Sequence, residues 1–349
     1  GISSPLDVVY TITPIYDGNE DCEGTPYTYT VTVNPTTGVS FIDDIVVCNG
    51  DFIDNIEFTS TTQGGETTYE WVATGDDIGL DQTDDGSGLI SGFTADNISL
   101  EPLVASITVT PTFTNGGVSS EGDPLTFTIT VNPTAQVDLV DSLDLCNGDT
   151  AVVDFTTSNG GVDSVTTYSW EITDGDSVFA SAALTGAGNI NLPVANDTNA
   201  DLVATVTVTP TYTNDGVDCT GPSEEFTITV SPTAQVDQVD DIVVCNGDEV
   251  AEIVFATTSE NDIAYSWSID TEIGTQSLTG VGNIPLFEAD NDTNDPIVAI
   301  VTVTPSNDET DPSLTCEGSS IEFTITVNPT AQVDLVDSLD LCNGDTAVV

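Results

Sequence analysis

The sequence predicts an all-β fold in which β-sandwich domains follow one another end to end as a rod. A short proline-ending motif recurs at intervals of 98, 99 and 97 residues, which indicates a tandem array. Between its copies, apolar residues alternate with threonine, the period-2 pattern of half-buried strands. We find no segment with a convincing helical pattern.

The recurring motif is Thr-Val-Asn-Pro or Thr-Val-Ser-Pro. A longer segment, 127–153, recurs without change as 323–349, which indicates recent duplication. The chain therefore divides into the C-terminal part of one repeat, three full repeats and the N-terminal part of a further repeat: 1–34, 35–132, 133–231, 232–328 and 329–349.

Each full repeat contains about seven predicted strands, separated by turns rich in Gly, Asn, Asp and Pro. The segments 204–213 (ATVTVTPTYT) and 226–230 (FTITV) show the alternation most clearly. A length of about 100 residues with seven strands is typical of an immunoglobulin-like sandwich. A Tyr-x-Trp pair falls on the third predicted strand of each repeat. We expect its tryptophans to lie in the core between two sheets, the alternative being an aromatic platform for sugar: Trp71, Trp170 and Trp267.

The composition of the chain excludes most kinds of catalytic and binding site. The chain has 59 Asp and Glu residues and no Lys, Arg, His or Met. It therefore offers no imidazole base, no amine nucleophile and no cation for nucleic acid or an anionic membrane surface. The carboxylates recur with the repeats, and no unique insertion forms a cleft. We predict no enzyme, with neither catalytic nor cofactor-binding residues. The 38% apolar content, in ordered alternation, distinguishes the chain from an acidic disordered segment.

Seven cysteines occur in two settings, and disulfide bonds are their natural interpretation in a secreted protein. One setting is the motif Cys-Asn-Gly-Asp, at Cys48, Cys146, Cys245 and Cys342. The other is Cys-x-Gly, at Cys22, Cys219 and Cys316. In the repeat 35–132, Ser120 takes the second position.

Three pairing schemes are open. Pairing within a repeat is preferred because the duplicated unit then carries its own pair, and it gives the candidates Cys146 with Cys219 and Cys245 with Cys316. Pairing across a junction gives Cys22–Cys48, Cys219–Cys245 and Cys316–Cys342. The third scheme joins neighbouring repeats as Cys48–Cys219 and Cys146–Cys316.

Acidic clusters recur in the turns between strands. Closely spaced oxygen ligands suit Ca²⁺, although none of the clusters has the full EF-hand spacing, and solvated turns are the alternative. No cofactor is required, and Ca²⁺ is the one candidate. Its candidate ligands are Asp174, Asp176, Asp197, Asp201, Asp290, Asp292 and Asp295.

The joint pattern of Cys-Asn-Gly-Asp, Tyr-x-Trp, Gly-x-Gly-x-Ile (186–190 and 280–284), Val-Thr-Val-Thr-Pro, Cys-x-Gly and Phe-Thr-Ile-Thr-Val-Asn-Pro covers essentially the whole chain. It resembles the PKD-like, immunoglobulin-type repeats of very large surface proteins from gliding Bacteroidetes. That resemblance implies a long adhesin, exported by the type IX secretion system and carried along the cell surface.

The same resemblance draws attention to Asp-Ser/Thr-apolar triplets as O-glycosylation candidates, at Ser142, Thr150, Ser164 and Ser177. Three Asn-x-Ser/Thr triplets match the N-glycosylation pattern, with simple turns as the alternative. They begin at Asn97, Asn196 and Asn291.

We therefore expect an extracellular, cell-surface stalk segment of a filamentous adhesin for gliding motility or attachment. Its partners would be an extracellular surface or other copies of itself, and cell-surface motility or secretion machinery reached through other regions. One alternative is a structural fibre or sheath that assembles laterally without its own adhesive site. Another is a ligand-binding module, which would require one repeat to carry a distinct aromatic-bearing loop, and we find none.

Overall fold

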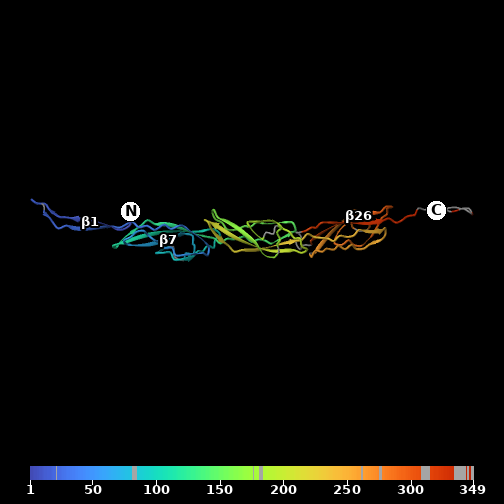
Figure 1. The fold of residues 1–349 in the computed structure, drawn as a ribbon, viewed down its shortest axis with the longest axis horizontal. Helices are drawn as coiled ribbons and strands as arrows, with labels where there is room; N and C mark the ends of the chain where they lie inside the picture. The colour runs from blue at the N-terminus through green and yellow to red at the C-terminus, as the bar shows by residue number, and fades with distance from the viewer. Residues whose placement is uncertain are drawn as a thin grey trace.

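The computed structural model describes residues 1–20, 22–80, 85–175, 177–180, 184–260, 262–274, 277–307, 315–333, 343 and 346. All regular elements within these residues are β-strands. The described residues contain no helix long and apolar enough to cross a membrane. Figure 1 shows three sandwiches in a row along one long axis, with a hairpin at the N-terminal end of the rod. The predicted all-β fold of tandem sandwiches is confirmed.

The strands fall into the groups that the repeats define. The N-terminal segment holds β1 (Leu6–Ile12), β2 (Ile15–Tyr16), β3 (Cys22–Glu23) and β4 (Tyr27–Val33). The first full repeat, 35–132, holds β5 (Ile45–Cys48), β6 (Phe52–Ile53), β7 (Glu66–Gly75), β8 (Asp85–Ser87), β9 (Phe93–Thr94), β10 (Leu103–Asn115), β11 (Val118–Glu121) and β12 (Leu125–Asn132).

The second full repeat, 133–231, holds β13 (Leu143–Cys146), β14 (Thr150–Val153), β15 (Val165–Gly175), β16 (Thr185–Ala187), β17 (Ile190–Pro193), β18 (Leu202–Asn214), β19 (Val217–Thr220) and β20 (Glu224–Ser231). The third, 232–328, holds β21 (Ile242–Cys245), β22 (Glu249–Val250), β23 (Ile263–Ile269), β24 (Thr279–Val281), β25 (Phe287–Glu288), β26 (Ile297–Asn307) and β27 (Ile321–Asn328).

The three full repeats share the order of the five main strands in the larger sheet and the two-stranded smaller sheet. In the second repeat the larger sheet has the order β13-β20-β18-β15-β16, with β19 paired to β18, and the smaller sheet is β14-β17. Its first strand pairs in parallel with its last, so that Cys146 lies opposite Ser231, whereas the other strand pairs are antiparallel. The long strand β18 extends beyond its pairing with β20, and this extension forms a hairpin with β19 at one end of the domain.

The core lies between the two sheets of each repeat. On β18, Ala204, Val206 and Val208 are fully buried, while the threonines between them are partly exposed. This is the burial pattern that the sequence alternation predicts. Phe226 and Ile228 of β20 complete the same buried layer. Because each repeat has its own core, the rod is a series of separately packed domains.

The tryptophan of each repeat is buried, with Trp71, Trp170 and Trp267 exposed by 1%, 5% and 5%. Their indole rings therefore cannot serve as a surface platform for sugar. Trp170 pairs across the strands with Gly186, the first glycine of Gly-x-Gly-x-Ile. A Cβ atom at Gly186 would lie 2.2 Å from Cζ2 of Trp170. The motif thus keeps one position free of a side chain so that the indole ring can cross the strand.

The N-terminal hairpin β1–β4 corresponds to β18–β20 of the second repeat. Its Val8, Tyr10 and Ile12 stand where that repeat buries Ala204, Val206 and Val208. In the hairpin they are exposed, because no other described segment covers this face.

Replacing Gly186 by alanine should destabilise the second repeat by about 1–3 kcal/mol, because the added methyl group overlaps the ring of Trp170. Thermal unfolding of the full chain measures the change. Thr185→Ala, at the exposed neighbouring position of β16, is the matched control and should have a small effect. Equal stability of the two variants would contradict this account of the motif.

Candidate functional site at the repeat junctions

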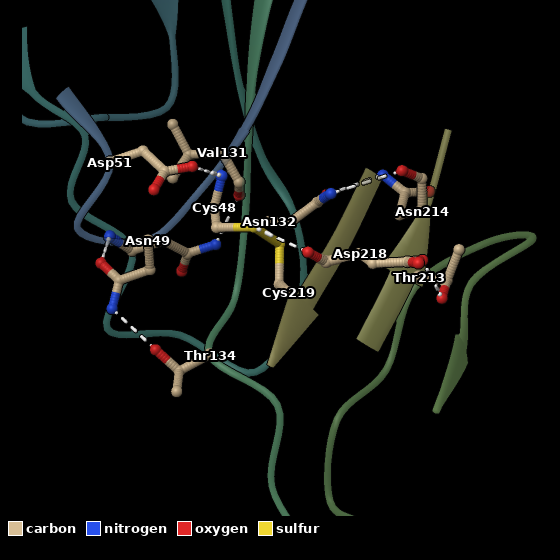
Figure 2. Close-up of a disulfide and its surroundings, with 11 residues drawn as sticks. Cys48, Asn49, Asp51, Val131, Asn132, Thr134, Thr213, Asn214, Asp218 and Cys219 are labelled. Carbon is tan, nitrogen blue, oxygen red and sulfur yellow. Dashed lines mark hydrogen bonds between the residues drawn. A yellow bond between two sulfur atoms is a disulfide. The ribbon is translucent and has the colours of Figure 1, made fainter. Parts of the chain in front are cut away.

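Two disulfide bonds join consecutive repeats. Cys48 of the first full repeat is bonded to Cys219 of the second, with Cα atoms 5.5 Å apart. Cys146 of the second is bonded to Cys316 of the third, with Cα atoms 5.4 Å apart. Figure 2 shows the first bond, between the end of the first repeat and the β18–β19 hairpin of the second. The pairing within a repeat that the sequence analysis preferred is wrong, and the third scheme describes the structure.

The length of the sandwich explains the correction. Cys146 lies opposite Ser231, the last residue of β20, whereas Cys219 lies beyond the first residue of β20 at the opposite end of the domain. Eight residues of strand, at about 3.3 Å each, separate these ends by about 25 Å. A disulfide requires Cα atoms within about 7 Å. Of the cysteines in the described part of the chain, Cys22 and the predicted candidate Cys245 are unpaired.

The motif Cys-Asn-Gly-Asp builds a tight turn that presents its cysteine. The backbone N–H of Cys48 donates a hydrogen bond of 2.9 Å to Oδ2 of Asp51. Gly50 adopts a φ of 88°, a left-handed conformation in which a side chain would be strained. The side chain of Asn49 accepts a hydrogen bond from the backbone of Asn97 and donates one to Thr134, which follows the junction proline. The turn therefore ties the cysteine to the linker (Figure 2).

The element that carries the partner cysteine is the hairpin of β18 and β19, residues 211–220, which we call the tongue of the second repeat. The Cys-x-Gly motif ends at Gly221, directly after the tongue. A Cβ atom at Gly221 would lie 1.8 Å from the carbonyl oxygen of Ala135. The equivalent Gly318 would have the same conflict with Ala234. The glycine therefore lets the base of the tongue lie directly against the linker backbone.

A small core of its own stabilises the first disulfide-bonded junction. Ala135, Tyr212 and Cys219 are almost completely buried and pack together. Beside them, two asparagines exchange hydrogen bonds: Nδ2 of Asn132 donates to the backbone oxygen of Asn214, and Nδ2 of Asn214 donates to Oδ1 of Asn132. Buried amides paired in this way fix the relative position of two domains because either partner alone would be left unsatisfied.

A second contact lies across the junction from the tongue. The backbone N–H of Gly160 in the second repeat donates to the carbonyl of Leu100 in the first, at 2.9 Å. At the next junction, Glu260 donates in the same way to Asn199, at 2.8 Å. With a tongue contact and a loop contact, each of these junctions is held at two separate points.

Each of the three Asn-x-Ser/Thr triplets forms a turn, and the turns at Asn97 and Asn196 supply this loop contact. Their asparagines are exposed by only 1–2%. The Nδ2 atom of Asn196 donates to the carbonyls of Ala200 and Val230, and Thr198 bonds back to its Oδ1. Both N–H groups of the side-chain amide are therefore used in hydrogen bonds within the protein, and N-glycosylation there would require the turn to unfold. The simple-turn interpretation describes these sites: Asn97, Asn196 and Asn291.

The junction between the second and third repeats keeps the disulfide but changes its surroundings. Asn307 stands where the second repeat has Tyr212, as the alignment of β26 and β18 shows. Ser231 stands where the first repeat has Asn132. Nδ2 of Asn307 donates to the carbonyl of Pro232, at 3.0 Å, and its buried Oδ1 has no hydrogen-bond partner among the described residues.

The remaining predicted site residues are the calcium and O-glycosylation candidates. No three potential metal-ligating side chains come together in the part of the chain that the structure describes, so Ca²⁺ binding stays a prediction. Asp176 lies outside the described residues, and the other six candidates are exposed: Asp174, Asp197, Asp201, Asp290, Asp292 and Asp295. Of the O-glycosylation candidates, Ser142, Thr150 and Ser177 are exposed and Ser164 is half-buried.

Comparison with known proteins gives one family match. A family model described as "PKD-like domain" matches residues 3–37, a segment that includes the β1–β4 hairpin. Its counterpart in the second full repeat is the segment of β18, β19 and β20, so the match supports a PKD-like, immunoglobulin-like repeat. No curated protein matches the chain.

Among solved structures, Drosophila N-cadherin EC1-4 is 12% identical with a TM-score of 0.30, the match covering 95% of this chain and 85% of that one. The human desmocollin-1 ectodomain is 12% identical with a TM-score of 0.29, at 96% and 70% coverage. The insect immune protein hemolin is 11% identical with a TM-score of 0.28, at 87% and 79% coverage. These scores are too low to indicate a shared overall structure, and the fold rests on the strand topology of the chain itself.

Alkaline pH should loosen the first disulfide-bonded junction. Burial raises the pKa of Tyr212 above its ordinary value, with a smaller contribution from Glu101. The folded pKa therefore exceeds the unfolded value of about 10, and this contribution to stability is present below pH ~10 and is lost as the pH rises through the folded pKa. We expect the melting temperature of the second repeat to fall over that range.

The variant Tyr212→Phe tests whether this tyrosine causes the pH dependence. The fold accommodates phenylalanine at this position, because Phe113 occupies it in the first repeat. The variant loses the 2.9 Å hydrogen bond from the tyrosine hydroxyl to Gly160, which costs about 1 kcal/mol at neutral pH. Its alkaline loss of stability should be shallower than in the unmodified chain. Tyr10→Phe, on the exposed hairpin, should retain the full pH dependence. Identical pH profiles for all three proteins would contradict the assignment to Tyr212.

Proposed function

We propose that this chain is a load-bearing stalk segment of a secreted, filamentous cell-surface adhesin that serves gliding motility or attachment. The observation that supports the proposal is the interleaving of the two disulfides along the chain. Cys146 lies between Cys48 and Cys219, and Cys219 lies between Cys146 and Cys316. The two covalent loops therefore overlap, and neither can extend independently of the other.

Interleaving changes the path that tension takes. If the ends are pulled, the shortest covalent path runs through residues 1–48, crosses to Cys219, returns through 146–219, crosses to Cys316 and leaves through 316–349. Fewer than half of the 349 residues lie on this path. The segments 49–145 and 220–315 stay slack, so the cores that they contribute to the first and third repeats are shielded from the load.

The chemistry of the chain supports a place outside the cell. Disulfides persist in oxidising compartments and are rare in the reducing cytosol. A formal charge of −59 keeps neighbouring filaments apart and the rod extended. The junction prolines Pro133 and Pro232 restrict the linkers to extended geometry, and the described junctions add covalent and hydrogen-bonded contacts on either side of them.

Single-molecule stretching from Gly1 to Val349 tests this function. At about 3.4 Å per residue, the fully reduced chain should extend to about 1,200 Å, whereas the oxidised chain should stop near 530 Å. The double variant Cys48→Ser, Cys146→Ser should extend to the longer value without reductant. Equal extension of the oxidised and reduced chains would contradict the load-bearing role.

A scattering measurement on the same oxidised chain distinguishes a laterally assembled fibre from a single stalk. We expect small-angle scattering to give the mass of one chain and a rod whose length does not change when Ca²⁺ is replaced by a chelator. A mass of several chains would favour the laterally assembled fibre. Shortening or bending in chelator would assign the stiffness to Ca²⁺ at the acidic turns instead of to the disulfides.

A further inference from the structure

The C-terminal end of the third full repeat carries the same docking face that the first two repeats use. Cys245 is exposed and unpaired. Its backbone N–H donates to Oδ2 of Asp248 at 2.9 Å, as the bonded Cys48 donates to Asp51 and Cys146 to Asp149. The turn that presents the cysteine is therefore already formed without a partner.

The surroundings of Cys245 repeat those of the occupied faces. Nδ2 of Asn246 donates to Oγ1 of Thr330 at 3.0 Å, as Asn49 does to Thr134 at 2.9 Å. The buried turn at Asn291 is held by hydrogen bonds to Asp295 and Val327, which match those of Asn196 to Ala200 and Val230. The residues that make the disulfide, linker and loop contacts at the occupied faces therefore each have an equivalent at this face.

One residue position distinguishes the two junction types. Asn328 lies opposite Cys245 on β27, in the position of Asn132, whereas the second repeat has Ser231 there. Asn132 exchanges hydrogen bonds with Asn214 of the tongue that it receives. The sequence of the third repeat has Glu309 at the position of Asn214. A tongue with asparagine at that position, like that of the second repeat, therefore fits the face at Asn328 better.

We propose that this face, formed by Cys245, Asn246, Asn328 and the turn at Asn291, binds the tongue of a further sandwich of the second repeat's type and forms a disulfide between Cys245 and its Cys-x-Gly cysteine. In the step, both thiols are oxidised and one S–S bond forms. A disulfide oxidant such as oxidised glutathione takes the two electrons and two protons and leaves as two molecules of reduced glutathione.

The sequence itself supplies a chimera that tests the proposal. Because 323–349 repeats 127–153 without change, appending a copy of residues 154–328 after Val349 completes one repeat of the second type and adds one of the third. After oxidation with glutathione, we expect Cys245 to be cross-linked to the appended copy of Cys219. The appended copy of Cys316 should pair with Cys342, and this second bond reports that the added repeats have folded.

Two controls define the outcome. A chimera whose appended copy of Cys219 is serine, the residue that the first repeat has at Ser120, should leave Cys245 open to alkylation while the reporter disulfide still forms. A chimera in which the reporter bond forms but Cys245 remains free, or in which the appended copy of Cys219 pairs with Cys342, would overturn the proposal.

A measurement on protein from its native source does not depend on the folding of a chimera. Cys245 should resist alkylation in the non-reduced protein and react after reduction, and the peptide released with it should contain Cys-x-Gly. Complete alkylation of Cys245 before reduction would overturn the proposal. Neither result depends on whether the rod bears load, so the failure of this inference and that of the stalk function are distinguishable.

Discussion

The docking of a tongue onto the end of the preceding repeat is the interaction on which the architecture depends. A single sandwich has its own core and gains nothing from a neighbour unless something holds the two together. Here the Cys48–Cys219 bond closes a separation of 171 residues, and the buried contacts of Tyr212 and Asn132 surround it. Closure of a loop that long removes several kcal/mol of chain entropy from the unfolded state in the entropic account of disulfides. The junction is therefore part of the fold.

The composition of the chain explains why its junctions take this form. With 59 carboxylates and no cationic side chain, the repeats cannot be joined by ion pairs, and like charges on adjacent domains repel each other. Contacts that carry no charge must then hold the domains in place. Amide hydrogen bonds, backbone contacts at Gly221 and disulfides all meet this requirement, and none is weakened by the negative surface around it.

Much of the fold could be predicted because it follows from local periodicity. The alternation on 204–213 reappears as the burial pattern of β18, and the Tyr-x-Trp position reappears as a buried tryptophan. The disulfide pairing could not be predicted, because sequence spacing does not show which end of a sandwich each cysteine occupies. The parallel pairing of β13 with β20, which sets Cys146 far from Cys219, is a long-range contact without a local signal. The glycine of Cys-x-Gly was the available clue, since it marks a close approach of two backbones.

Peptide mapping of the non-reduced protein tests the central claim most directly. The chain lacks Lys and Arg, so a glutamyl endopeptidase is the suitable protease, and glutamates separate all seven cysteines along the sequence. The structure predicts one linked peptide pair containing Cys48 and Cys219 and another containing Cys146 and Cys316. Linked pairs of Cys146 with Cys219 and of Cys245 with Cys316 would contradict it, because each repeat would then be closed on itself and the rod would have no covalent connection between domains beyond its linkers.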